Sequence, residues 1–211
     1  MNVLTIKQIP TGTIQENCYL IYNDKSLLVV DPGDEAKKIE AEIDALDVKP
    51  EAILITHAHY DHIGAVDEIR DRYNIPVYIS PIEQSWLTDP QLNLSGLSRH
   101  DDMADVTARE AEFELKNYDN YTIGDMTFKV VPTPGHSPGS VSFIFDDFIV
   151  CGDALFRGSV GRTDLPFGDS QTLLSGIKKE LFTLPDDTKA YPGHGPVTSI
   201  GREKQENPFF N

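Results

Sequence analysis

Apolar and polar positions change their spacing along the chain, and the changes predict short strands alternating with helices. Apolar runs bounded by turn residues predict strands at 3–9, 17–23, 26–33, 52–56, 77–80, 121–123, 127–132, 140–145, 148–152 and 189–191. Apolar residues at helical spacing predict helices at 36–46, 63–73, 82–87 and 171–184, and a short tail ends the chain. Strands and helices alternating on one core indicate an α/β fold, and the length suits one domain over residues 1–211.

The segment from Thr88 to Asn117 departs from both spacings. It is polar and contains PQLNLSGLSRHDDM without clear periodicity. A stretch of this length inside a compact domain is more often functional or mobile than incidental. We therefore keep residues 88–117 as a candidate lid or interface.

The charge balance narrows the range of partners. Eighteen Lys and Arg against 34 Asp and Glu give 18 − 34 = −16, and no basic run occurs. Nucleic-acid binding needs clustered positive charge, so nucleic acid is not an expected partner. No apolar run approaches the length that crosses a bilayer, and the N-terminus does not resemble a signal peptide, so we expect a cytoplasmic protein with no membrane partner. Two cysteines in apolar runs, Cys18 and Cys151, predict buried reduced thiols. The sequence leaves the oligomeric state open.

Histidines and aspartates gather where strands end. His57, His59, Asp61 and His62 follow the apolar run 52–56 directly. Single histidines after strands are usually structural, but a cluster changes this interpretation because metal ligands come in groups.

The later strands end in the same way. His136, Asp153 and His194 each follow a strand, and a glycine precedes each of them directly. Loops at the carboxyl ends of strands hold the sites of α/β folds, and glycine permits the tight turn that points a side chain into a shared cleft. His100 lies outside this pattern.

Imidazole and carboxylate together suit zinc, iron or manganese. The seven candidate ligands exceed the four that one tetrahedral ion binds, whereas two ions sharing a bridging carboxylate use them all. In extended chain His57 and His59 point to the same side and can reach one ion. Asp61 and His62, at the start of the next helix, can reach a second. Such paired ions lie roughly 3.5–4 Å apart and bind a bridging hydroxide.

Four motifs, THAHYDHIG, TPGHSPGS, GDALF and PGHG, occur in this order, and with them the chain resembles the metallo-β-lactamase superfamily. The resemblance covers essentially the whole chain and implies a four-layer αββα sandwich. It also implies a first metal site from His57, His59 and His136, a second from Asp61, His62 and His194, and Asp153 as the bridging ligand. Two divalent ions, with zinc first and iron or manganese as alternatives, would be the cofactors.

The segments GSVGRTDLPFGD and TSIGREKQENPFF resemble the small glyoxalase II-like (hydroxyacylglutathione hydrolase-like) thioesterases. This resemblance implies hydrolysis of S-lactoylglutathione, or of a related S-acyl thiol, to a hydroxy acid and a thiol. A metal-bridging hydroxide would attack the carbonyl, with Asp61 and Asp153 in the catalytic centre.

Larger members of that family carry a helical domain after the position of His194, where only residues 195–211 follow here. The departure leaves open which thiol is carried. A persulfide dioxygenase with one iron ion shares this ligand set and a GRTD-like segment, and is the alternative. Arg162, Arg202 and Tyr60, which lie near the ligands in sequence, are candidate contacts for the small-molecule thioester.

Overall fold

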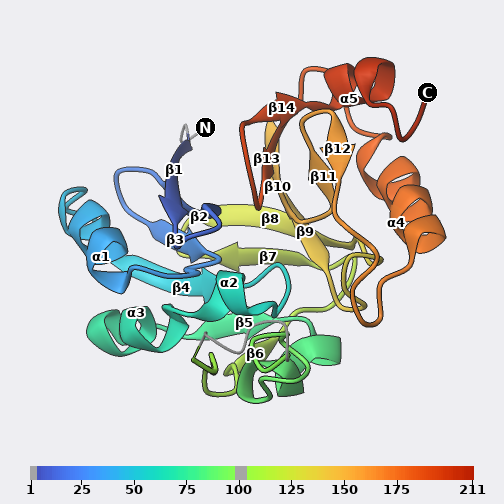
Figure 1. Cartoon of the computed structure of the whole chain (residues 1–211). Coiled ribbons are helices and arrows are strands. Elements are labelled where there is room, and N and C mark those ends of the chain that lie inside the picture. Colours follow the sequence, from blue (N-terminus) through green and yellow to red (C-terminus); the bar gives the residue numbers. More distant parts are fainter. Residues whose placement is uncertain (1–3, 98–103) are drawn as a thin grey trace. The chain divides into compact units, whose positions relative to one another are not determined.

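The computed structural model describes residues 4–97 and 104–211 (Figure 1). The chain forms two compact units, and each is described by itself. The first comprises Met1–Glu114 with Thr122–Met126, and the second comprises Leu115–Tyr121 with Thr127–Asn211. Each unit contains one six-stranded sheet covered by helices. A single domain over residues 1–211 stays a prediction.

The sheet of the first unit has its strands in sequence order. They are β1 (Thr5–Thr11), β2 (Glu16–Tyr22), β3 (Leu27–Val30), β4 (Pro50–Leu54), β5 (Val77–Ile79) and β6 (Phe113–Glu114). The pairs from β1 to β3 are antiparallel, and those from β3 to β6 are parallel. The carboxyl ends of β3, β4 and β5 therefore meet at one edge, where the candidate ligands of this unit begin.

Two helices cover this sheet because their apolar residues recur every three to four positions. Helix α1 (Ala36–Asp44) buries Ile39 and Ile43, and helix α3 (Val66–Tyr73) buries Val66 and Ile69. These side chains share one core with the strand residues Leu20, Leu27, Val29, Ile53 and Val77. Helices at 36–46 and 63–73 were predicted. The second is interrupted, because a four-residue helix α2 (Tyr60–Ile63) ends before α3 begins.

The predicted helix at 82–87 is the 3₁₀ helix η1 (Pro81–Thr88). Beyond it, the described part of the 88–117 segment is organised by the buried side chain of Asn93. The Asn93 amide donates to the carbonyl oxygens of Trp86 (3.2 Å) and Val106 (2.8 Å), and its oxygen accepts from the Ser95 hydroxyl (2.8 Å). The buried amide therefore ties Ser95 and Val106 to η1. Residues 98–103, with His100, lie outside the described residues.

The sheet of the second unit has the order β14-β13-β10-β9-β8-β7, of which Thr122 and Ile123 in β7 and Met126 in β8 belong to the first unit. Its strands are β7 (Asn120–Ile123), β8 (Met126–Pro132), β9 (Val141–Ile144), β10 (Phe148–Gly152), β13 (Lys189–Pro192) and β14 (Thr198–Ser199). A small hairpin of β11 (Leu155–Phe156) and β12 (Ser159–Val160) follows β10. Since β10 and β13 are parallel, the residues after them, Asp153 and His194, leave the sheet at the same edge.

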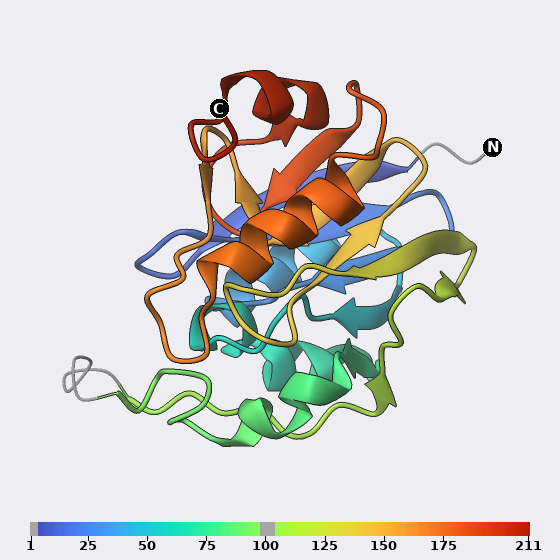
Figure 2. The ribbon, with the colours of Figure 1, turned by 90° about the vertical axis from the view of Figure 1, so that its right-hand side faces the viewer.

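Helix α4 (Ser170–Gly176) and the π-helical turn Ile177–Leu181 continue one another and lie across this sheet (Figure 2). Leu173, Ile177 and Leu181 are fully buried on its strands, as predicted for a helix at 171–184. No described helix is both long and apolar enough to cross a membrane.

A helix, α5 (Ile200–Glu206), forms close to the C-terminus, where only a tail was predicted. Its buried face is polar, because Glu203 and Asn207 are fully buried beside Ile200. The Glu203 carboxylate accepts from Gly158 N (2.8 Å) and from Asn207 Nδ2 (2.8 Å). A helix that buries a carboxylate and a C-cap amide shows no apolar period, and the prediction was wrong for this reason.

Candidate metal centre

The first unit places four candidate ligands after β4. The rings of His57 and His59 lie 4.7 Å apart, and those of His57 and His62 lie 4.1 Å apart. Asp61 Oδ2 is 3.5 Å from His62 Nε2. All three histidines are buried, and the Asp61 side chain is 12% exposed. Helix α2 is the reason for the grouping, because its single turn carries both Asp61 and His62.

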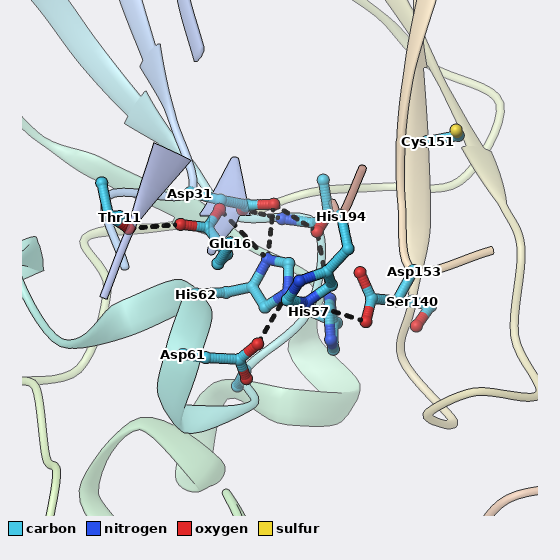
Figure 3. A network of polar contacts seen from close by, with 12 residues as sticks. Thr11, Glu16, Asp31, His57, Asp61, His62, Ser140, Cys151, Asp153 and His194 are labelled. Carbon is cyan, nitrogen blue, oxygen red and sulfur yellow. Dashed lines mark hydrogen bonds and ion pairs between the residues drawn. The ribbon is translucent and has the colours of Figure 1, made fainter. Parts of the chain in front are cut away.

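Asp31 orients two of these histidines, His62 directly and His57 through Thr56. Figure 3 shows its carboxylate turned toward the His62 ring. Asp31 follows β3, is buried, and adopts a left-handed backbone with φ 47°. Its carboxylate accepts from Thr56 N (2.8 Å), from Thr56 Oγ1 (2.6 Å) and from His62 Nδ1 (3.0 Å). The Thr56 hydroxyl donates its one proton to Asp31, so its oxygen can only accept from His57. His57 Nδ1 therefore donates to Thr56 Oγ1 at 3.1 Å.

These bonds fix the tautomers of two candidate ligands. With the proton on Nδ1, the Nε2 atoms of His57 and His62 carry the lone pair that a metal ion requires. His59 packs its ring against Trp86, with ring centroids 6.1 Å apart and nearly parallel planes.

A second buried carboxylate, Glu16, stands beside Asp31. Glu16 Oε2 accepts from Thr11 Oγ1 (2.8 Å), and Glu16 Oε1 is 3.7 Å from His62 Nδ1 (Figure 3). Burial raises the pKa of Glu16 well above its ordinary value, against an opposing effect of His62. Sequence reasoning missed both acids. The signal for Asp31 was present, since it follows a buried strand in SLLVVDPG as His136 follows β8.

Close backbone packing sets the position of α2. A Cβ atom on Gly33 would lie 1.7 Å from the carbonyl oxygen of Asp61, and one on Gly64 would lie 2.4 Å from the carbonyl oxygen of Gly33. Only glycine permits both approaches. The loop after β3 and the helix that bears Asp61 are therefore locked together.

The second unit brings together the other three candidate ligands. Asp153 Oδ2 is 3.5 Å from His136 Nε2 and 3.5 Å from His194 Nε2. Gly135 (φ 128°) and Gly152 (φ 47°) adopt backbone conformations that other residues avoid, as expected for the turns before His136 and Asp153. Gly193 lacks a positive φ; its N–H donates to Gly152 O (2.8 Å) and ties the two strand ends together.

The segment after Asp153 supports this group through its backbone. His136 Nδ1 donates to the carbonyl oxygen of Arg162 at 2.8 Å, which again leaves the lone pair on Nε2. A Cβ atom on Gly161 would lie 1.8 Å from the carbonyl oxygen of Asp153. The GRTD segment thus contacts the candidate ligands with main-chain atoms.

The separations within each unit fit a metal ion. Two ligand atoms of one tetrahedral ion, each about 2.1 Å from it, lie about 3.4 Å apart. The Asp61–His62, His136–Asp153 and His194–Asp153 pairs all measure 3.5 Å. Asp153 Oδ2 is equally near two histidines, as an oxygen bonded to two ions would be. Geometry and donor chemistry therefore fit divalent metal ions.

The candidate substrate contacts lie in different surroundings. Arg162 is exposed, and its guanidinium makes two 2.8 Å bonds to Asp164. Arg202 lies on α5 and pairs with Glu206 at 2.7 Å. Tyr60 opens α2, where its N–H donates to Asn93 O at 3.0 Å. Their roles in binding stay predictions.

Both cysteines are buried and outside disulfides, as predicted. Burial raises the pKa of Cys151 to about 12, and its Sγ donates to Leu155 O at 3.3 Å. A thiol that stays protonated near neutral pH is a poor nucleophile. The nearness of Cys151 to Asp153 in sequence is therefore a matter of packing.

The family model described as metallo-beta-lactamase superfamily matches residues 11–194. The chain belongs to this superfamily. The mixed α/β metallo-β-lactamase fold, predicted from the motifs, is confirmed. All seven candidate ligands lie within the matched residues.

The matches to relatives and to solved structures cover nearly the whole chain. A probable metallo-hydrolase of Streptococcus pyogenes is 49% identical over 93% of this chain and 86% of its own length. A hydroxyacylglutathione hydrolase, GloC, of Haemophilus influenzae is 36% identical over 99% of both chains. The structure titled BLEG-1 B3 metallo-beta-lactamase is 47% identical, covers 98% of this chain and 100% of its own, and superposes with a TM-score of 0.94. The structure titled TTHA1623 in a di-iron-bound form is 36% identical, covers 96% and 99%, and gives 0.84.

Proposed function

We propose that this superfamily member is a binuclear metallohydrolase that cleaves thioesters in the manner of glyoxalase II. The first ion would be held by His57, His59 and His136, and the second by Asp61, His62 and His194. Asp153 would bridge the two. The observation that carries the proposal is the set of Nδ1 hydrogen bonds at His57, His62 and His136. These bonds keep the ring proton on Nδ1 and leave the lone pair of each Nε2 for a metal ion.

When bound, two divalent cations supply Lewis acidity and lower the pKa of coordinated water to about 7. Side chains of the chain would balance the positive charge of these cations and orient the ligands. Asp61 and Asp153 each contribute a negative charge, and the Asp31 carboxylate fixes the orientation of the His62 ring through its bond to Nδ1. Cys151 is not a candidate nucleophile, because burial keeps its thiol protonated and its Sγ donates to Leu155 O.

The substrate class rests on two kinds of support. The GloC relative, named a hydroxyacylglutathione hydrolase, aligns over 99% of both chains. The reaction also suits the site, since a thiolate leaves without help from a general acid. We propose S-lactoylglutathione or a related S-acyl thiol as substrate, and zinc as the first candidate metal. A cytoplasmic location fits the two thiols that remain outside disulfides.

The test is thiol release from S-lactoylglutathione and from S-lactoyl esters of other small thiols, by protein loaded in turn with zinc, iron and manganese. Elemental analysis follows on the same samples. The proposal expects about two metal equivalents per chain and release of one thiol per thioester. Oxygen uptake with a persulfide by a one-iron form, without thioester cleavage, would replace it by the dioxygenase alternative.

The B3 metallo-beta-lactamase structure favours a second candidate, hydrolysis of a β-lactam amide. A chromogenic cephalosporin tests it on the same metal-loaded samples. Turnover that exceeds thioester turnover would make the β-lactam the preferred substrate class.

A further inference from the structure

The candidate ligands His57 and His59 lie on a stretch of chain that has just left the sheet. Ile55 N still bonds β5, donating to Tyr78 O at 2.9 Å, whereas residues 56–59 belong to no strand or helix of the described structure. His57, Ala58 and His59 are nevertheless all buried. Since buried main-chain N–H groups need acceptors, other parts of the chain must supply them here.

Glu83 supplies the acceptor for Ala58. Its side chain is fully buried, and its Oε2 accepts from Ala58 N at 2.6 Å. A glutamate is almost never buried to this degree unless its carboxyl group is bonded. The bond fixes the peptide group that joins His57 to Ala58, between the two candidate ligands of this stretch.

Trp86, one turn further along η1, contacts the same stretch. A 3₁₀ helix repeats every three residues, so Glu83 and Trp86 project from one side of η1. The rings of Trp86 and His59 are 6.1 Å apart between centroids, with planes 28° apart. Helix η1 therefore contacts the main chain before His59 with a carboxylate and the ring of His59 with an indole.

Asn93 extends this support past His59. Tyr60 N donates to Asn93 O at 3.0 Å, and the Asn93 amide donates to Trp86 O at 3.2 Å. The main-chain N–H groups on both sides of His59, those of Ala58 and Tyr60, are thus bonded by the segment that runs from η1 to Asn93.

The orientation of the bonded peptide group decides how the two imidazoles stand to each other. A peptide group is planar, so tilting it changes ψ of His57 and φ of Ala58 together. Such a tilt turns the His57 side chain relative to that of His59. The carboxylate of Glu83 opposes this tilt, because its bond to Ala58 N is lost when the N–H turns away.

We propose that Glu83 is a positioning residue for a metal ion. Its carboxylate fixes the peptide between His57 and Ala58, and this keeps the rings of His57 and His59 directed to one ion. The proposal rests on the metal sites of the proposed function and is independent of the substrate.

The experiment separates the reach of the Glu83 side chain from its charge. Glu83→Asp keeps a carboxylate but shortens the side chain by one methylene group, whereas Glu83→Gln keeps the length and one oxygen. Glu112→Asp is the matched control, because Glu112 Oε2 also accepts from a main-chain N–H of the first unit, that of Val77, at 2.8 Å. Zinc affinity is measured by competition with a chelator. The absorption spectrum of the cobalt(II)-loaded protein reports ligand geometry, and the thermal midpoint reports stability.

We expect Glu83→Asp to lower the affinity of one zinc equivalent about 10- to 100-fold and to change the cobalt spectrum. Glu83→Gln should stay within about threefold of the wild type with an unchanged spectrum, since its amide oxygen still accepts from Ala58 N. Glu112→Asp should change the thermal midpoint alone. The proposal is overturned if Glu83→Asp binds zinc like the wild type, or if Glu83→Gln or Glu112→Asp loses as much affinity.

These readouts do not depend on turnover. Expected affinities without cleavage of any thioester would therefore remove the proposed function and leave the role of Glu83 standing. A wild-type protein that binds neither zinc nor cobalt would overturn both.

Discussion

Replacing Asp31 by asparagine tests whether the carboxylate behind His62 tunes the metal ligands. Asp31 accepts three hydrogen bonds, two from Thr56 and one from His62. An amide has one oxygen where the carboxylate has two. If that oxygen faces His62, the NH₂ group meets Thr56 N–H. If it faces Thr56 N–H, His62 Nδ1 loses its acceptor.

Each arrangement leaves a buried donor unsatisfied, at a cost of about 1–3 kcal/mol in the free energy of unfolding. The second also frees His62 to change tautomer, which removes the lone pair from Nε2. Loss of such an outer partner lowers metal affinity about 10- to 100-fold. At about 1.4 kcal/mol per tenfold, this equals about 1.4–2.8 kcal/mol of binding free energy.

Competition with a chelator measures the affinity of each metal equivalent, and urea unfolding of the metal-free protein measures stability separately. Asp34→Asn is the matched control, since Asp34 is exposed three residues further along and should change stability by less than about 0.5 kcal/mol. Equal metal affinities for Asp31→Asn and the wild type would refute the reasoning.

Two further predictions concern the GRTD segment. Gly161→Ala should lower activity at least about tenfold with loss of bound metal, because the added Cβ would lie 1.8 Å from Asp153 O. Elemental analysis compares this variant with Gly176→Ala, whose Cβ would meet nothing nearer than 3.9 Å. Equal metal content in the two variants would contradict the prediction. Arg162→Ala keeps the carbonyl that binds His136, so metal content should stay constant while KM for a carboxylated thioester rises about tenfold. Steady-state kinetics with a neutral thioester is its control, and an equal rise with that substrate would assign Arg162 to the fold.

The candidate ligands were predictable because their signal is local. A histidine or aspartate directly after an apolar strand can be found without knowing which strands pair. His57, His136 and Asp153 were found in this way, and in the structure each lies within four residues of the end of a strand. Helix α1 was also predictable, since its apolar period reflects one buried face.

The residues that support the ligands were less predictable because their partners are distant in sequence. Glu16 and His62 are 46 positions apart, and only the order of β1 to β4 brings them together. Helix α5 was missed for a related reason. Its buried Glu203 bonds Gly158, 45 positions earlier, so no neighbour in sequence indicates that a carboxylate belongs inside.

The backbone of Asp31 shows how a strained conformation can serve the orientation of metal ligands. Asp31 follows β3 and has φ 47°. At Asp31 three hydrogen bonds to neighbours offset the strain, and they also orient His57 and His62. Since a strained conformation persists only where the surroundings favour it, the left-handed backbone of Asp31 belongs with the histidines that its carboxylate orients.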